Sequence, residues 1–128
     1  MRDLIDKIRN GSARITLIGL GYVGLPLAVE FGRKFSTVGF DTKPERIREL
    51  EEGRDHTLET SPEELKAAAR LTFTSNPEEI RNRDVYIVTV PTPVDKSNIP
   101  DLTMLRKASE TVGRSIGKGA LVIYESTV

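Results

Sequence analysis

The chain has 128 residues, 38% hydrophobic and 30% charged, a composition that fits one compact globular domain and excludes a disordered segment. Lysine plus arginine and aspartate plus glutamate each total 19, so the formal net charge is zero and we expect no nucleic-acid partner. With no cysteine and one histidine, His56, we expect no disulfide, no metal site and no Ser-His-Asp triad. No apolar run reaches the ~20 residues that span a bilayer, and no signal peptide opens the chain, so we expect a cytoplasmic protein without a membrane partner.

Strand and helix patterns alternate along the whole chain. Short runs of branched apolar residues predict strands, and apolar residues at helical spacing predict the helices between them. In chain order, the expected elements are helix 3–10, strand 14–18, helix 26–35, strand 37–41, helix 44–50, a short helix from 61, strand 71–74, a short helix from 76, strand 84–90, helix 102–116 and strand 120–124. This alternation predicts an α/β fold with a doubly wound parallel sheet of the Rossmann type, in strand order 3-2-1-4-5.

A glycine-rich turn follows the first of these strands. Gly19, Gly21 and Gly24 fit the pattern G-x-G-x-x-G between a strand and the first long helix. The first glycine permits the tight turn, the second the approach of a pyrophosphate, and the third the close packing of helix on strand. We therefore predict that the turn binds a dinucleotide, with the main-chain N–H groups of Tyr22 and Val23 directed at the phosphates. The alternative is a tight turn without a ligand.

An acidic residue at the end of the second strand indicates which dinucleotide is bound. Asp41 lies ~20 residues beyond the glycines, where a carboxylate accepts the hydroxyls of the adenosine ribose and repels a 2′-phosphate. We therefore predict NAD as the cofactor in preference to NADP. Arg46 lies further along the next helix and could reach the same end of the cofactor. The alternative for Asp41, compatible with ribose binding, is that it caps that helix. We interpret His56 and the acidic run 49–52 as solvated surface.

Three motifs together resemble the amino-terminal NAD domain of the UDP-glucose/GDP-mannose dehydrogenase family. They are residues 18–28 (IGLGYVGLPLA), 90–93 (VPTP) and 125–128 (ESTV), and their spacing matches that domain across essentially the whole chain. The string PDLT at 100–103 and the ESTV form of the last motif are similar to the branch that acts on UDP-N-acetylhexosamines. The UDP-glucose branch more often has lysine at the position of Glu125, whose role here stays open.

The resemblance implies an enzyme that oxidises the C6 alcohol of a UDP-sugar to a carboxylate in two NAD-dependent steps, for surface-polysaccharide precursors. It implies a homodimer for the full-length enzyme and a catalytic cysteine and lysine beyond residue 128, so we expect no catalytic residue here and no activity from this chain alone. The cofactor contacts that it implies are Tyr22, Val23, Asp41, Arg46, Thr92 and Thr127. The alternative for Thr92 is a hydroxyl bonded only within its own turn.

We therefore expect residues 1–128 to be the NAD-binding domain of a longer enzyme. Since a complete dinucleotide fold has a sixth strand beside the fifth, residues 121–123 would form an open apolar edge through which chains self-associate. Three alternatives are a UDP-glucose 6-dehydrogenase, a domain that senses NAD(H) without catalysis, and a methyltransferase that uses S-adenosylmethionine. The third glycine and the long helix after it argue against the last.

Overall fold

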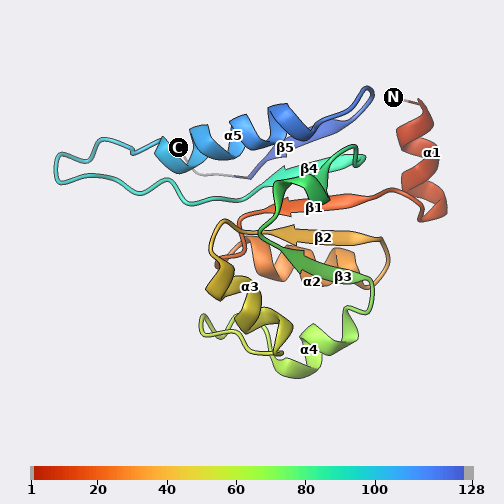
Figure 1. The fold of residues 1–128 in the computed structure, drawn as a ribbon, viewed down its shortest axis with the longest axis horizontal. Coiled ribbons are helices and arrows are strands. Elements are labelled where there is room, and N and C mark those ends of the chain that lie inside the picture. Colours follow the sequence, from red (N-terminus) through yellow and green to blue (C-terminus); the bar gives the residue numbers. More distant parts are fainter. Residues whose placement is uncertain (1, 126–128) are drawn as a thin grey trace.

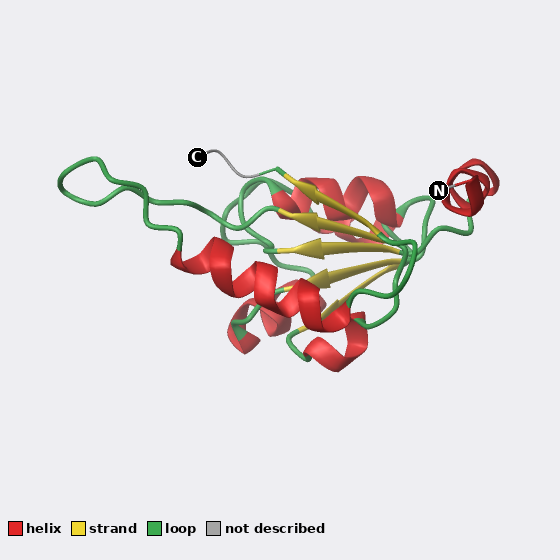
Figure 2. Cartoon of the chain, turned by 90° about the horizontal axis from the view of Figure 1, so that it is seen from above, coloured by secondary structure: helices red, strands yellow, loops and turns green. Residues whose placement is uncertain are grey.

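The computed structural model describes residues 2–125 and has helices on both faces of a five-stranded parallel sheet (Figures 1 and 2). The strands are β1 (Ile15–Ile18), β2 (Thr37–Phe40), β3 (Leu71–Thr74), β4 (Val85–Val88) and β5 (Leu121–Tyr124). The helices are α1 (Arg2–Asn10), α2 (Gly24–Gly32), α3 (Pro44–Glu51), α4 (Pro62–Ala67), the 3₁₀ helix η1 (Pro77–Ile80) and α5 (Thr103–Ser115). The strand order is β3-β2-β1-β4-β5, which confirms the predicted fold class and order.

Two apolar clusters, one on each face of the sheet, account for the alternation seen in the sequence. Leu17 of β1 and Ile87 of β4 pack with α2 and α3 on one face. Ile18 and Val88 point to the other face and pack with α5 and η1. Because β1 and β4 are buried on both sides, their residues form continuous apolar runs, as central parallel strands do.

Proline residues and polar caps fix where several helices begin. Pro44 and Pro62 occupy the first turns of α3 and α4, where the missing N–H has no intrahelical role. The Ser61 side chain accepts a hydrogen bond from Glu64 N, and the Glu64 carboxylate accepts one from Ser61 N, so α4 begins with a capping box. The predicted helix starts near 61 and 76 are therefore confirmed, although the second is a single 3₁₀ turn.

The helix α2 differs from its predicted bounds by more than one residue at each end. It begins at Gly24, two residues before the expected Pro26, and ends at Gly32 instead of Phe35. Lys34 N and Phe35 N both donate to Phe31 O, the first across three residues as in a 3₁₀ helix, so the chain leaves α2 through a tighter final turn while Phe35 stays in the core. No helix among residues 2–125 combines the length and the apolarity required to cross a membrane.

Candidate dinucleotide-binding site

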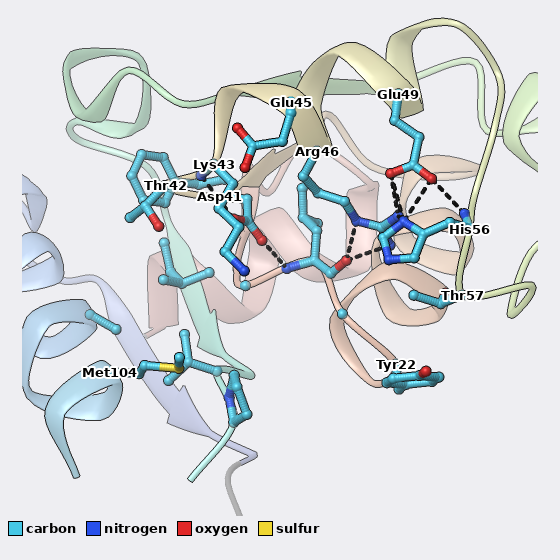
Figure 3. Close-up of a pocket in the computed structure, with 18 of the residues that line it drawn as sticks. Tyr22, Asp41, Thr42, Lys43, Glu45, Arg46, Glu49, His56, Thr57 and Met104 are labelled. Atoms are coloured by element: carbon cyan, nitrogen blue, oxygen red, sulfur yellow. Dashed lines mark hydrogen bonds and ion pairs between the residues drawn. The ribbon is translucent and has the colours of Figure 1, made fainter. Parts of the chain in front are cut away.

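A cavity of about 860 Å³ opens at the carboxyl ends of the strands (Figure 3). Its walls are the turn after β1, the end of β2 with the start of α3, the loop after α3, the end of β4 and one side of α5. Ligands of doubly wound sheets bind at this edge, beside the point where the strand order reverses. In this sheet the reversal lies between β1 and β4, which border the cavity through Gly19 and Val90.

The three glycines of the turn after β1 meet different demands. Gly19 has a φ of +99°, a left-handed conformation that a side chain would strain. A Cβ at Gly24 would overlap the carbonyl oxygen of Gly19, so this position must be glycine for α2 to approach the turn. The roles predicted for the first and third glycines are thus confirmed. A Cβ at Gly21 would meet open space, which leaves its backbone accessible from the cavity.

A threonine at the end of β4 fastens the turn to the sheet. The Thr89 hydroxyl is buried and lies 2.8 Å from Gly19 O and 3.1 Å from Ile18 O, within donating distance of both. Its contact connects β4 to the glycine turn across the point where the strand order reverses. This role of Thr89 was not predicted, although a polar residue inside an apolar strand pattern is a signal that could have revealed it.

Asp41 follows β2 and contacts both the glycine turn and α3. One carboxylate oxygen accepts the Leu20 N–H at 3.0 Å, and the other accepts the Lys43 N–H at 3.1 Å. Lys43 is the N-cap residue of α3, so this bond closes an Asx turn before the helix and reaches no N–H of its first turn; the capping alternative for Asp41 is therefore wrong. Each carboxylate oxygen has more than one lone pair, and the half-buried group borders the cavity, so it retains capacity for a further donor.

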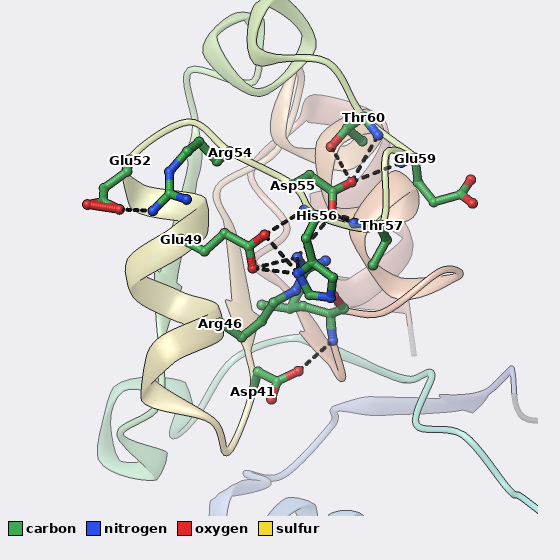
Figure 4. A network of polar contacts seen from close by, with 11 residues as sticks. Asp41, Arg46, Glu49, Glu52, Arg54, Asp55, His56, Thr57, Glu59 and Thr60 are labelled. Carbon is green, nitrogen blue, oxygen red and sulfur yellow. Dashed lines mark hydrogen bonds and ion pairs between the residues drawn. The ribbon is translucent and has the colours of Figure 1, made fainter.

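Arg46 lies beside the cavity but directs its charge into the protein. Its side chain is 6% exposed, and its Nε and Nη2 donate to Leu20 O at 2.9 and 2.6 Å. Its Nη1 donates to Asp55 at 3.0 Å and Glu49 at 3.1 Å (Figure 4). Arg46 borders the same cavity as Asp41, and its contact with the cofactor stays a prediction, whereas its extensive protein contacts were not foreseen.

The acidic run 49–52 is not uniformly solvated, so that interpretation is wrong for Glu49. Its side chain is 13% exposed and pairs with both Arg46 and the imidazole Nδ1 of His56, 2.8 Å away. Burial opposes the charge, but the bonds from His56 and Arg46 outweigh it and lower the pKa of Glu49. The imidazole itself is 71% exposed, in agreement with its interpretation as a surface group.

The remaining predicted site residues differ in their placement. Tyr22 and Val23 are exposed at the glycine turn, and Tyr22 lines the cavity. Thr92 is half-buried in the loop after β4, where Pro91 borders the cavity. Thr127 lies outside the described residues, so its predicted contact has no structural counterpart here.

Comparison with known sequences gives a family match over most of the chain. A model of the UDP-glucose/GDP-mannose dehydrogenase family, NAD binding domain, matches residues 13–128. UDP-N-acetyl-D-glucosamine 6-dehydrogenase of Pseudomonas aeruginosa is 56% identical over 115 residues, which cover 90% of this chain and 27% of that protein. The enzyme of the same name from Salmonella typhi is 56% identical over 124 residues, covering 97% of this chain and 28% of that protein.

Solved structures show the same architecture. The UDP-D-ManNAc dehydrogenase of Pyrococcus horikoshii superposes with a TM-score of 0.85 at 37% identity, covering 90% of this chain and 28% of that one. A GDP-mannose dehydrogenase from Pseudomonas aeruginosa gives a TM-score of 0.82 at 27% identity, with the same two coverages of 90% and 28%. The chain therefore spans little more than a quarter of the length of these relatives.

Proposed function

Because the chain belongs to the UDP-glucose/GDP-mannose dehydrogenase family, as its NAD-binding domain, we propose that it binds NAD within a UDP-N-acetyl-D-glucosamine 6-dehydrogenase. The observation that carries the substrate class is the 56% identity to two enzymes of that name, against 36% for a UDP-N-acetyl-D-mannosamine dehydrogenase. In this proposal the whole enzyme oxidises the C6 alcohol of the sugar to the carboxylate. That change removes two hydrides, so each turnover reduces two NAD molecules.

The geometry of the cavity fits NAD, the cofactor of this family's domain. Bound NAD supplies a hydride acceptor, and the protein must hold the dinucleotide and orient it. The backbone at Gly21 is open to the cavity and lies beside the N-terminus of α2, where the positive end of the helix dipole suits a pyrophosphate. At the far end, the half-buried Asp41 carboxylate suits ribose hydroxyls and disfavours a 2′-phosphate.

We assign the cofactor contacts as the sequence predicts them. The pyrophosphate lies against the glycine turn, and the adenosine ribose lies beside Asp41 and Arg46. The remaining assigned contacts are Tyr22, Val23, Thr92 and Thr127. No residue of this chain is assigned to proton transfer or nucleophilic attack, since the cysteine that the resemblance implies lies elsewhere in the enzyme. A homodimer, a role in surface-polysaccharide precursors and a cytoplasmic location remain predictions.

The first test is a binding titration of the full-length enzyme with NAD and NADP, for the native protein and Asp41→Ala. We expect NAD to bind more tightly than NADP and Asp41→Ala to lose about tenfold or more in NAD affinity, because the proposed charge-assisted hydrogen bonds from the ribose hydroxyls to the carboxylate disappear. Glu51→Ala removes an exposed carboxylate of the same helix region, so it is the matched control and should leave NAD affinity unchanged. Unchanged affinity in Asp41→Ala would contradict the ribose assignment.

Substrate assays separate the main alternatives. Reduction of NAD with UDP-N-acetylglucosamine and not with UDP-glucose supports the proposal, and the reverse preference assigns the UDP-glucose 6-dehydrogenase reaction. NAD binding without turnover of any UDP-sugar would instead favour a sensing domain.

A further inference from the structure

A buried ion pair connects the loop after α3 to the glycine turn (Figure 4). Asp55, in that loop, accepts from Arg46, which in turn donates twice to the Leu20 carbonyl. We propose that Arg46 and Asp55 are positioning residues of the NAD site. Asp55 fixes the orientation of the Arg46 guanidinium, and Arg46 keeps the glycine turn in its binding geometry through its bonds to the Leu20 carbonyl. This inference rests on NAD binding at that turn, as proposed above.

Leu20 is the residue through which the turn is held. Its N–H donates to Asp41 and its carbonyl accepts from Arg46, so the peptide groups on both sides of it have fixed partners. Its side chain is fully buried and packs over Gly39 of β2. Fixing Leu20 also fixes the planes of the peptides that flank it, which belong to Gly19 and Gly21. The backbone donors of the turn are therefore oriented before the cofactor arrives, which lowers the ordering cost of binding.

Asp55 is suited to lock Arg46 because it has only donors around it. One carboxylate oxygen accepts from Arg46 and from the Thr57 N–H and hydroxyl, and the other accepts from Glu59 N and from the Thr60 N–H and hydroxyl. Its side chain is 0% exposed. Burial opposes ionisation, but the bonds from Thr57 and Arg46 hold the pKa of Asp55 well below its ordinary value. Asparagine would fit poorly, since its amide would face donors in either orientation.

The proposed positioning role of Arg46 depends on the several donors of its planar guanidinium and not on its positive charge alone. Nε and Nη2 reach the Leu20 carbonyl on one side while Nη1 reaches Asp55 on another. A lysine keeps the positive charge but has a single ammonium group, so it cannot span both partners in this way. Arg46→Lys therefore breaks the connection while preserving any direct attraction between this position and the cofactor phosphates.

The test combines two measurements on the full-length enzyme: NAD affinity, and hydrogen–deuterium exchange of the glycine-turn peptide in the absence of NAD. For Arg46→Lys we expect the dissociation constant for NAD to rise about tenfold and exchange of that peptide to quicken about fivefold or more. Arg33→Lys is the matched control because Arg33 is an exposed arginine near the end of α2, outside the cavity, and both readouts should match the native protein. Asp55→Asn should reproduce both effects of Arg46→Lys.

The double variant shows whether the two residues act through one connection. Arg46→Lys combined with Asp55→Asn should bind NAD within about twofold of Arg46→Lys alone, because the second change breaks a link already lost. If Asp55→Asn does not fold, the NAD affinity and the exchange of the glycine-turn peptide in Arg46→Lys alone test the proposal. Weakened NAD binding with unchanged exchange of the turn would overturn the proposal and leave Arg46 with a direct cofactor contact only. Native protein that binds no NAD would refute the proposed function, while the exchange measurement, made without NAD, would still test the connection to the turn.

Discussion

The two sides of the cavity are built in different ways. On the β1–β2 side, buried charges fix the glycine turn: Arg46 and Asp41 hold Leu20, and Asp55 holds Arg46. On the β4–β5 side, the loop 91–101 projects away from the sheet (Figures 1 and 2). Side chains that anchor backbone are thus concentrated where the dinucleotide turn lies. The domain presets the β1–β2 side of its site through contacts between elements, whereas the loop on the other side is held by bonds among its own residues.

The projecting loop is ordered by its own residues. One Asp95 carboxylate oxygen accepts from Ser97 N and Ile99 N, and Val94 pairs with Pro100 as an antiparallel bridge. Val94 and Ile99 nevertheless remain exposed. Local hydrogen bonds can therefore define a loop's shape without burying its apolar side chains, in contrast to the buried contacts on the β1–β2 side.

The largest expected effect comes from blocking the close approach of α2 to the glycine turn, on the preset side of the cavity. Gly24→Ala should destabilise the domain by about 3 kcal/mol or more, because the added Cβ overlaps the Gly19 carbonyl, which is backbone and cannot move aside cheaply. Urea unfolding followed by circular dichroism measures the change. Gly113→Ala is the matched control: this exposed glycine within α5 has open space at its Cβ, so stability should rise by about 0.5–1 kcal/mol. Equal stability of Gly24→Ala and the native chain would show that α2 can shift away from the turn.

An intermediate effect is expected at the open edge of β5. Leu121 N and Glu125 N donate to β4, so the alternation of the strand directs the N–H of Tyr124 away from the sheet. We expect the 128-residue chain to self-associate through this edge, and Tyr124→Pro to weaken the association several-fold by removing that outward donor. Sedimentation velocity over a concentration series measures it. Tyr124→Thr, which keeps the N–H, should associate like the native chain, and a native chain that stays monomeric at high concentration would refute the expectation.

The smallest expected effect concerns the pH dependence of the preset side. The pKa of Asp55 is below its ordinary value of 3.8, so its stabilisation is complete above about pH 5 and is lost as the pH falls through 3.8 toward the lower folded value. Thr57→Val removes a hydroxyl that donates to Asp55 at 2.6 Å and should cost about 1 kcal/mol at pH 6. Because the folded-state pKa of Asp55 lies well below 3.8, its carboxylate stays ionised in the folded protein at pH 3, so the difference between variant and native protein should persist from pH 6 to pH 3, as urea midpoints at both pH values would show. A difference that disappears by pH 3 would mean that Asp55 is already protonated in the folded protein there and that its pKa is not lowered.

The fold could be predicted from the sequence because its signals are local and repeated. Branched apolar runs predict strands, and those of β1 and β4 were within two residues of the observed bounds at either end. The prolines at the starts of α3 and α4 gave the helix boundaries, whereas no comparable residue in the sequence marks the end of α2. The parallel order then follows from how strands and helices alternate.

A site residue could be predicted only where its role follows from its spacing, in the sequence, from a predicted strand. The glycines and Asp41 have fixed spacing from the strands that carry them, so their positions could be inferred. Asp55 could not be identified this way, since a lone aspartate in a polar loop resembles any turn residue until the loop folds back onto Arg46. Glu49 was misjudged for the same reason: its burial depends on His56, seven residues further on.

The exposed position of Tyr22 also gives the protein an intrinsic optical reporter. The chain has no tryptophan and only three tyrosines, so its ultraviolet emission comes from these three rings. Tyr86 is sealed in the core and Tyr124 lies on the edge strand, while Tyr22 lies on the cavity wall. A nucleotide that settles beside the glycine turn would alter the light emitted by Tyr22 first, so occupancy of the cavity can be followed without attaching a dye.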